Sequence, residues 1–190
     1  MIGGDWANVE PMRSGSGRRM PAGGYVIRMK SPTVRTSRKG QQYLEVLFDV
    51  AEGEWKDHYQ DIYDRFGFWS GKFSVFFEGK SKGFFKGFIE DVEASNGVQL
   101  VTPAGIDEKK LDGLLIGIVL QEEDYMSNSG EIKTRLVRDK LIPVDDIREG
   151  RFVVPPKKEY EGTVIPEAVE VVDMSDPAST FEQIDAELPF

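Results

Sequence analysis

The sequence predicts a mostly β protein: a small five-stranded barrel with one helix between the third and fourth strands. Two observations lead to this prediction. Segments that alternate apolar and polar residues lie on both sides of one segment whose apolar residues recur every three or four positions. Gly and Pro residues punctuate the chain between these segments, as expected for short strands joined by turns.

Two strands are expected at the start of the folded part of the chain, which we call the body (residues 20–158). The turn from Pro21 to Gly24 precedes an alternating segment at residues 25–29, and a second alternating segment covers residues 43–50. A basic loop at residues 30–40 should join them into a hairpin. Residues 55–77 are rich in aromatic and β-favouring residues, which favours one or two further strands before the helix.

The period changes at residues 80–95, where a helix of about four turns is expected. Asn96 and Gly97 supply a stop signal at its C-terminus. One face of such a helix must be buried, so we expect four of its apolar side chains to lie in the core. They are Phe84, Phe85, Phe88 and Ile89.

Two strands should follow the helix. The continuous apolar run at residues 114–120 indicates a buried strand, residues 121–130 a polar loop, and the alternating residues 132–137 the last strand. Three strands, a helix and two strands is the order of the Greek-key barrel called the OB-fold, which binds oligonucleotides across its second and third strands. A mixed α+β sheet would also accommodate this order.

Charge is segregated along the chain. All 24 Lys and Arg residues lie between Arg13 and Lys158, and nine of the 33 acids follow Lys158. Residues 1–158 therefore carry 24 acids against 24 bases, and the formal net charge of -9 belongs to the remainder. We expect a flexible arm at residues 1–19, an OB-fold domain at 20–158 and a disordered acidic tail at 159–190.

A neutral body leaves room for a nucleic-acid partner despite the acidic total. Single-strand binding needs cations for phosphates and flat rings for bases, and residues 65–86 contain five cations against one acid, with six aromatic side chains interleaved at residues 66–77. In a strand at residues 72–77, period two puts Phe73, Val75 and Phe77 on one face and Lys72, Ser74 and Phe76 on the other. The basic loop at 30–40 is a second candidate. The predicted contacts are Arg28, Lys30, Arg35, Arg38, Lys39, Arg65, Trp69, Lys72, Phe76, Lys80 and Lys82.

Other residues near these candidates are ambiguous. Acids surround Trp55, Tyr59 and Tyr63, which favours a structural role for them over contact with phosphates. The basic residues of the arm, Arg13, Arg18 and Arg19, suit either non-specific phosphate contacts or linker character.

The last six residues combine carboxylates with an apolar end that includes Leu188, Pro189 and Phe190. An exposed Phe in an acidic segment gains nothing unless a partner supplies a pocket. With Asp185 and Glu187, this end resembles the acidic tip of bacterial single-stranded DNA-binding proteins. The resemblance implies that it recruits replication or recombination proteins; an accidental end of the chain is the alternative.

The body is also similar to a family of small proteins from phages and mobile elements of Gram-positive bacteria. Residues 21–25, 49–54, 84–89, 93–96 and 146–150 carry this resemblance. It implies an OB-fold protein that coats single-stranded DNA, in which assembly into dimers or tetramers is common.

Composition argues against most enzyme classes. With one His, no Cys and no Gly-Lys-Ser/Thr phosphate loop, catalytic triads, zinc sites and nucleotide hydrolysis lack their usual residues, and no cofactor is expected. Asp124 followed by Glu131 and Lys133 leaves a metal-dependent nuclease as one alternative. A non-catalytic adaptor that binds protein is another.

The cellular setting follows from similar observations. The sequence contains no cysteine, no signal-peptide hydrophobic region and no apolar run long enough to span a bilayer. We therefore expect a soluble cytoplasmic protein without a membrane partner. DNA and RNA are not distinguished by the sequence.

Overall fold

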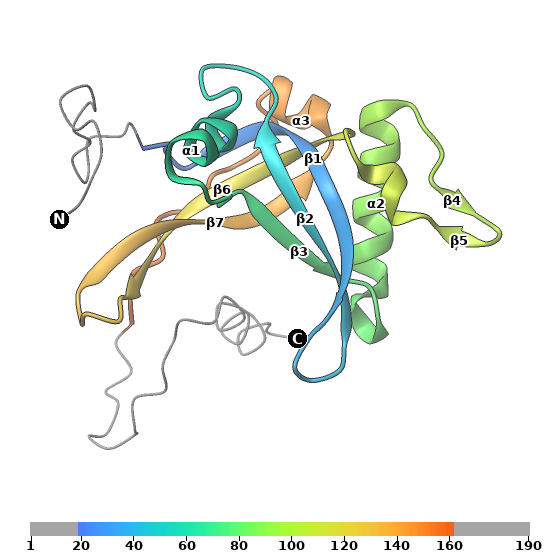
Figure 1. The fold of residues 1–190 in the computed structure, drawn as a ribbon. Helices are drawn as coiled ribbons and strands as arrows, with labels where there is room; N and C mark the ends of the chain where they lie inside the picture. The colour runs from blue at the N-terminus through green and yellow to red at the C-terminus, as the bar shows by residue number, and fades with distance from the viewer. Residues whose placement is uncertain (1–18, 162–190) are drawn as a thin grey trace, which may run out of the picture. The chain divides into compact units, whose positions relative to one another are not determined.

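A computed structural model describes residues 19–161 and contains one five-stranded antiparallel sheet (Figure 1). The spatial order of its strands is β3-β2-β1-β6-β7. A two-stranded hairpin stands apart from this sheet. The main strands are β1 (Gly23–Thr36), β2 (Gln42–Val50), β3 (Lys72–Phe76), β6 (Leu115–Met126) and β7 (Ile132–Ile142), and the hairpin is β4 (Val101–Thr102) with β5 (Gly105–Ile106).

The predicted alternation places one face of each central strand in the core. Ile27 and Met29 of β1 are fully buried, and so is Val46 of β2. On β3, Phe73 and Val75 are buried, whereas Lys72 is exposed. The assignment of alternate β3 residues to opposite faces is therefore confirmed.

Helix α2 (Lys82–Asn96) confirms the expected helix and its stop signal. Gly97 adopts the left-handed conformation with φ 63°, and its N–H donates to the carbonyl oxygen of Glu93 at 2.8 Å. Phe88 and Ile89 are buried and Phe85 packs against the core, but Phe84 is 82% exposed. Phe84 lies about 90° from the centre of the buried stripe at 3.6 residues per turn, so the expectation that it fills the core is wrong.

The structure has more helix than predicted. Part of the segment expected to hold strands forms α1 (His58–Phe66), and β3 is its only strand. A third short helix, α3 (Val144–Arg148), follows β7. Tyr59, Ile62 and Phe66 recur at helical spacing, and Tyr59 is buried. This short period was hidden among β-favouring aromatic residues. Residues 19–161 contain three α-helices where one was expected. Two 3₁₀ turns, η2 (Gly79–Ser81) and η3 (Glu108–Leu111), complete the described elements.

Two expected loops are largely strand. β1 continues to Thr36 through a register shift near Ser31, whose φ is 48°, so Lys30 and Arg35 lie within the strand. β6 likewise continues to Met126, pairing with β7 along its polar half. In both cases backbone pairing with a neighbouring strand extends the ladder, although the side chains are polar.

The expected barrel is not closed. β3 and β7 are the two edges of the sheet, and no backbone ladder joins them within the described residues. A side chain spans this gap instead, because Nη1 of Arg138 on β7 donates to the carbonyl oxygen of Ser74 on β3 at 2.9 Å. As predicted, α2 lies between the third and fourth strands of the main sheet in chain order.

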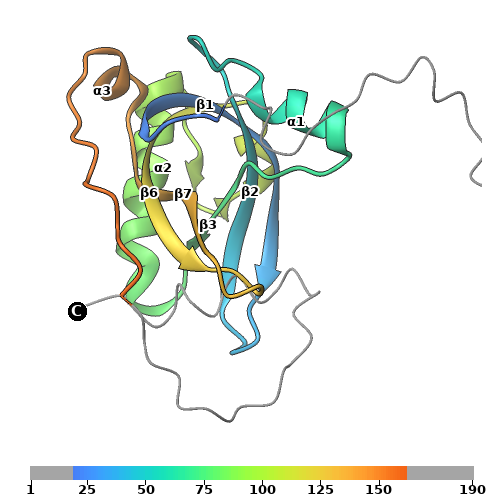
Figure 2. The same cartoon turned by 90° about the vertical axis from the view of Figure 1, so that its left-hand side faces the viewer.

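The segment after α3 runs back along β6 (Figure 2). Lys158 exchanges backbone hydrogen bonds with this strand, donating to Glu122 and accepting from Asp124 at 2.8 Å each. The described residues up to Tyr160 belong to one compact unit. Most of the expected N-terminal arm and acidic tail lies outside the described residues. Within residues 19–161, no helix is both long enough and apolar enough to cross a bilayer.

Candidate nucleic-acid interface

Three adjacent strands present a continuous row of side chains on the side away from the core, which we call the outer face. Its members follow from the register of β1 with β2 and of β2 with β3. Five of the predicted contact residues lie on it. Across the three strands the rows are Arg35, Tyr43 and Phe76; then Thr33, Glu45 and Ser74; then Lys30, Leu47 and Lys72; and finally Arg28 and Asp49.

The outer face is less basic than the sequence suggested. Glu45 lies at its centre and pairs with Arg35 at 3.3 Å and with Lys72 at 3.9 Å. Counting Asp49 as well, the face carries four cations and two acids, which leaves a net charge of +2. A phosphate bound here must therefore compete with Glu45 for its cations.

An aromatic pair occupies one end of the outer face. The rings of Tyr43 and Phe76 lie 5.4 Å apart in a tilted arrangement. Burial first and the nearby Glu45 carboxylate second raise the pKa of Tyr43, so its phenol is neutral at neutral pH. Tyr43 is only 8% exposed, so the half-buried Phe76 supplies most of the aromatic surface at this end.

Asp49, at the other end, is only 2% exposed. Its carboxylate accepts the backbone N–H groups of Tyr59 at 2.9 Å and Gln60 at 3.1 Å, which are in the first turn of α1. Asp57, the residue that precedes the helix, makes no side-chain cap. The start of α1 is therefore capped from β2, which satisfies N–H groups that a helix leaves unpaired.

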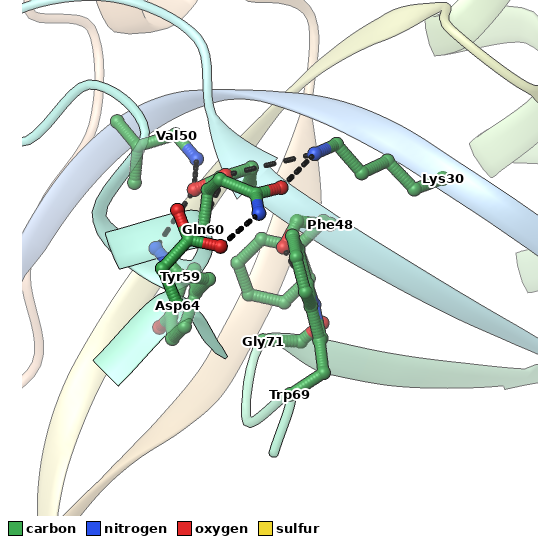
Figure 3. Close-up of polar contacts among 9 residues, drawn as sticks. Lys30, Phe48, Val50, Tyr59, Gln60, Asp64, Trp69 and Gly71 are labelled. Carbon is green, nitrogen blue, oxygen red and sulfur yellow. Dashed lines mark hydrogen bonds and ion pairs between the residues drawn. The ribbon is translucent and has the colours of Figure 1, made fainter. Parts of the chain in front are cut away.

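Lys30 is held in place by the same cluster (Figure 3). Its Nζ lies 3.8 Å from the Asp49 carboxylate and 3.5 Å from Oε1 of Gln60. It also lies 4.6 Å from the centre of the Trp69 ring. The ammonium group is thus placed over an aromatic ring, a favourable cation–π arrangement.

The Trp69 ring is fixed by its indole nitrogen. Nε1 donates to the carbonyl oxygens of Gly71 at 2.9 Å and Phe48 at 3.2 Å (Figure 3). Gly71 lies where no larger residue fits, since a Cβ there would lie 2.5 Å from the Phe48 carbonyl oxygen and 2.6 Å from the Tyr59 ring. This turn between α1 and β3 therefore sets the position of Trp69, another predicted contact residue.

Three exposed aromatic side chains continue from Trp69 over α1, and we call them the aromatic patch. Tyr63, Phe66 and Phe68 are 47%, 57% and 56% exposed. Sequence reasoning favoured a structural role for Tyr63, and it counted Phe66 and Phe68 in the basic aromatic stretch without naming them among the predicted contacts. The helical spacing of Tyr59, Tyr63 and Phe66 was the signal that could have placed two of these rings on one helix face.

The remaining predicted contacts do not lie on the outer face. Arg65 is exposed in the last turn of α1, and Arg38 and Lys39 lie in the turn between β1 and β2. Lys80 and Lys82 follow β3, in η2 and at the start of α2. These cations flank the face at different edges, so the single basic stretch of the sequence is divided in space. The predicted partner-binding residues, Asp185, Glu187, Leu188, Pro189 and Phe190, lie outside the described residues.

The residues of the nuclease alternative are occupied by other contacts. The Asp124 carboxylate lies 2.6 Å from Nζ of Lys157 and accepts the Thr134 hydroxyl at 2.5 Å, and both contacts lower its pKa. Glu131 pairs with Lys133 at 3.6 Å. Among residues 19–161, no cluster of three or more His, Cys, Asp or Glu side chains is arranged to hold a metal ion.

Comparison of the chain with protein-family models and with curated proteins gave no match. The candidate interface therefore rests on the geometry of the described residues.

Proposed function

We propose that this protein is a non-catalytic single-stranded DNA-binding protein of the phage or mobile-element type, with an OB-fold core. In this proposal the outer face coats unpaired DNA during replication or recombination. The acidic tail, through residues 185–190, recruits partner proteins. The chain catalyses no reaction and needs no cofactor.

The connectivity of the sheet supports the OB-fold part of the proposal. An OB-fold is a five-stranded, partly open Greek-key barrel in which strand one pairs with strands two and four. Here β1 pairs with both β2 and β6, and α2 precedes β6. The opening lies between β3 and β7, where Arg138 contacts Ser74. The outer face includes strands two and three, which are the strands that bind oligonucleotides in this fold.

The observation that carries the functional proposal is the clustering of cations around aromatic side chains on the outer face. The register brings Arg28, Lys30 and Lys72 to one end and Arg35 to the other, with the Tyr43–Phe76 pair beside Arg35. Single-strand binding without sequence preference uses these two components together, cations along the backbone and rings for bases.

Titration of the full chain with fluorescent poly-dT at increasing salt tests this proposal. Two to four neutralised phosphates should give a slope of log affinity against log salt between about -1.4 and -2.8, at about -0.7 per phosphate. Absence of binding at low salt, with retention of a protein partner, would support the adaptor instead. Cleavage that requires Mg²⁺ or Mn²⁺ and disappears in Glu131→Ala would support the nuclease.

The recruiting role of the tail has a separate test. Substituting Leu188→Ala and Phe190→Ala together removes the apolar side chains that a pocket would accept and keeps the acids. These substitutions should leave poly-dT affinity unchanged and abolish capture of replication or recombination proteins from the host. Equal capture by the unchanged and the substituted chain would contradict recruitment through this segment.

A further inference from the structure

The aromatic patch is not explained by packing. In α1, Tyr59 is buried against β2, and the next two rings on the same side of the helix extend beyond the core. Tyr63 and Phe66 are about half exposed, and Phe68 is equally exposed in the turn that follows. Clustered exposed rings cost solvation free energy, so their presence indicates a contact surface.

The patch is continuous with the outer face through Trp69. The rings of Tyr63 and Trp69 lie 6.0 Å apart, and those of Phe66 and Phe68 are separated by the same distance. On its other side Trp69 lies beneath the Lys30 ammonium, in the row that also contains Lys72. A strand of nucleic acid could therefore pass from the sheet onto α1 without leaving aromatic or cationic side chains.

Shape favours bases over a protein partner on this patch. A protein interface anchors its central side chains in pockets. Two hollows among the described residues, of about 240 and 340 Å³, are both lined by residues outside the patch. Flat, exposed rings suit stacking, which every base supports through its π face.

Charge on α1 sets the path of the phosphates. Helical spacing places Asp61 about 160° from Tyr63 around the axis, so its carboxylate faces away from the patch. Asp64 lies closer, and its carboxylate accepts a hydrogen bond from Nε2 of Gln60 at 2.9 Å. The phosphates are therefore expected on the Lys30 and Lys72 side, away from Asp64, with the bases directed toward α1.

We propose that Tyr63, Phe66 and Phe68 form a base-stacking subsite that extends the single-stranded DNA track from the outer face over α1. This inference rests on the proposed function, since it adds a subsite to the same interface. It assigns a role in binding to a helix between the second and third strands.

Ring removal at the exposed positions tests the subsite. The double variant Phe66→Leu, Phe68→Leu keeps apolar bulk and removes both π faces, whereas Phe66→Tyr, Phe68→Tyr keeps them. Phe84→Leu is the matched control, because Phe84 is 82% exposed on α2, across the sheet from α1 (Figures 1 and 2). The double Leu variant should lose poly-dT affinity at least about fivefold, and the double Tyr variant and Phe84→Leu should match the unsubstituted chain.

Oligonucleotides with abasic positions give the second measurement. If bases stack on the patch, replacing the bases by abasic sites weakens binding to the unsubstituted chain. The affinities of the unsubstituted chain and the double Leu variant should then be equal. If the double Leu substitution lowers the affinity for normal and abasic oligonucleotides by the same factor, stacking is overturned. Equal poly-dT affinity of the double Leu variant and Phe84→Leu would overturn the subsite and leave the proposed function standing. No poly-dT binding by the unsubstituted chain would overturn both.

Discussion

The buried carboxylate of Asp49 on β2 accepts the backbone N–H of Tyr59 at 2.9 Å and so caps helix α1 from a strand ten residues earlier. Asp49 also pairs with Lys30, which lies over Trp69. One carboxylate therefore joins the position of α1 to the position of two candidate DNA contacts. Its removal should affect both the stability of the fold and the shape of the interface.

Asp49→Ala should lower the free energy of unfolding by about 2–3 kcal/mol, because buried N–H groups of α1 lose their acceptor. Urea denaturation measures this change. Glu45→Ala is the control on the same strand; Arg35 and Lys72, with which Glu45 pairs, are partly exposed, so its cost should be about 1 kcal/mol or less. Equal effects of the two substitutions would show that the capping contacts are unimportant.

Stability should fall as the pH is lowered through the range in which His58, the single histidine, titrates. Burial lowers the pKa of His58 below 6.5, against the opposing effect of Asp49 and Asp61. The unfolded chain then binds the proton more readily than the folded chain, so stability rises with pH between the folded pKa and about 6.5. Thermal unfolding measured between about pH 5.5 and 7 should show this slope, and His58→Gln should flatten it. A slope that persists in the variant would assign it to other groups.

The salt dependence of DNA binding should identify the phosphate contacts. Arg28→Ala and Lys72→Ala each remove a cation from the outer face, and each should reduce the slope of log affinity against log salt by about 0.7. Lys86→Ala is the control, since Lys86 lies on α2 and pairs with Glu90 at 3.4 Å. A change of slope in Lys86→Ala alone would move the interface away from the outer face.

Glu45→Gln should strengthen DNA binding. The carboxylate of Glu45 pairs with Arg35 and Lys72, so a phosphate must displace it from these cations. Removing its charge should raise affinity for poly-dT by about two- to fivefold at low salt, the range expected for a partly exposed ion pair. Fluorescence anisotropy measures this gain, and Glu90→Gln on α2 should give none. Unchanged affinity in Glu45→Gln would place the phosphates elsewhere.

Two glycine substitutions should have opposite effects on stability. In Gly71→Ala the new methyl group would lie 2.5 Å from the Phe48 carbonyl oxygen, so the turn that holds Trp69 must shift, at a cost of about 1–3 kcal/mol. Gly87, in the interior of α2, has open space around it, and Gly87→Ala should stabilise the protein by about 0.5–1 kcal/mol. Thermal unfolding measures both changes. A stable Gly71→Ala variant would show that this turn adapts.

Helix α2 and the burial pattern of β3 could be predicted because each depends on a local period. The signal for α2 was the repeated apolar spacing followed by Asn96 and Gly97, and neither feature depends on distant residues. Helix α1 was missed because its apolar positions are aromatic or β-branched residues, which strands also favour. Its start is capped by Asp49, and no local rule connects that residue with Tyr59.

The candidate interface, too, could be predicted from the sequence only in part. The sequence identified the cations and aromatic residues as chemistry suited to unpaired DNA, and residue type alone determines that chemistry. It also determined which residues of β3 share a face, because side chains alternate along any strand.

Only the tertiary structure decided which of these residues lie together. Pairing of β1 with β2 and of β2 with β3 placed Arg28, Lys30, Arg35 and Lys72 on one face, and it placed Glu45 among them. The same folding separated Lys80 and Lys82 from that face and brought Trp69 beneath Lys30. The physical reason is that strand register and helix docking are set by non-local backbone pairing and burial, which a local pattern of residues does not specify.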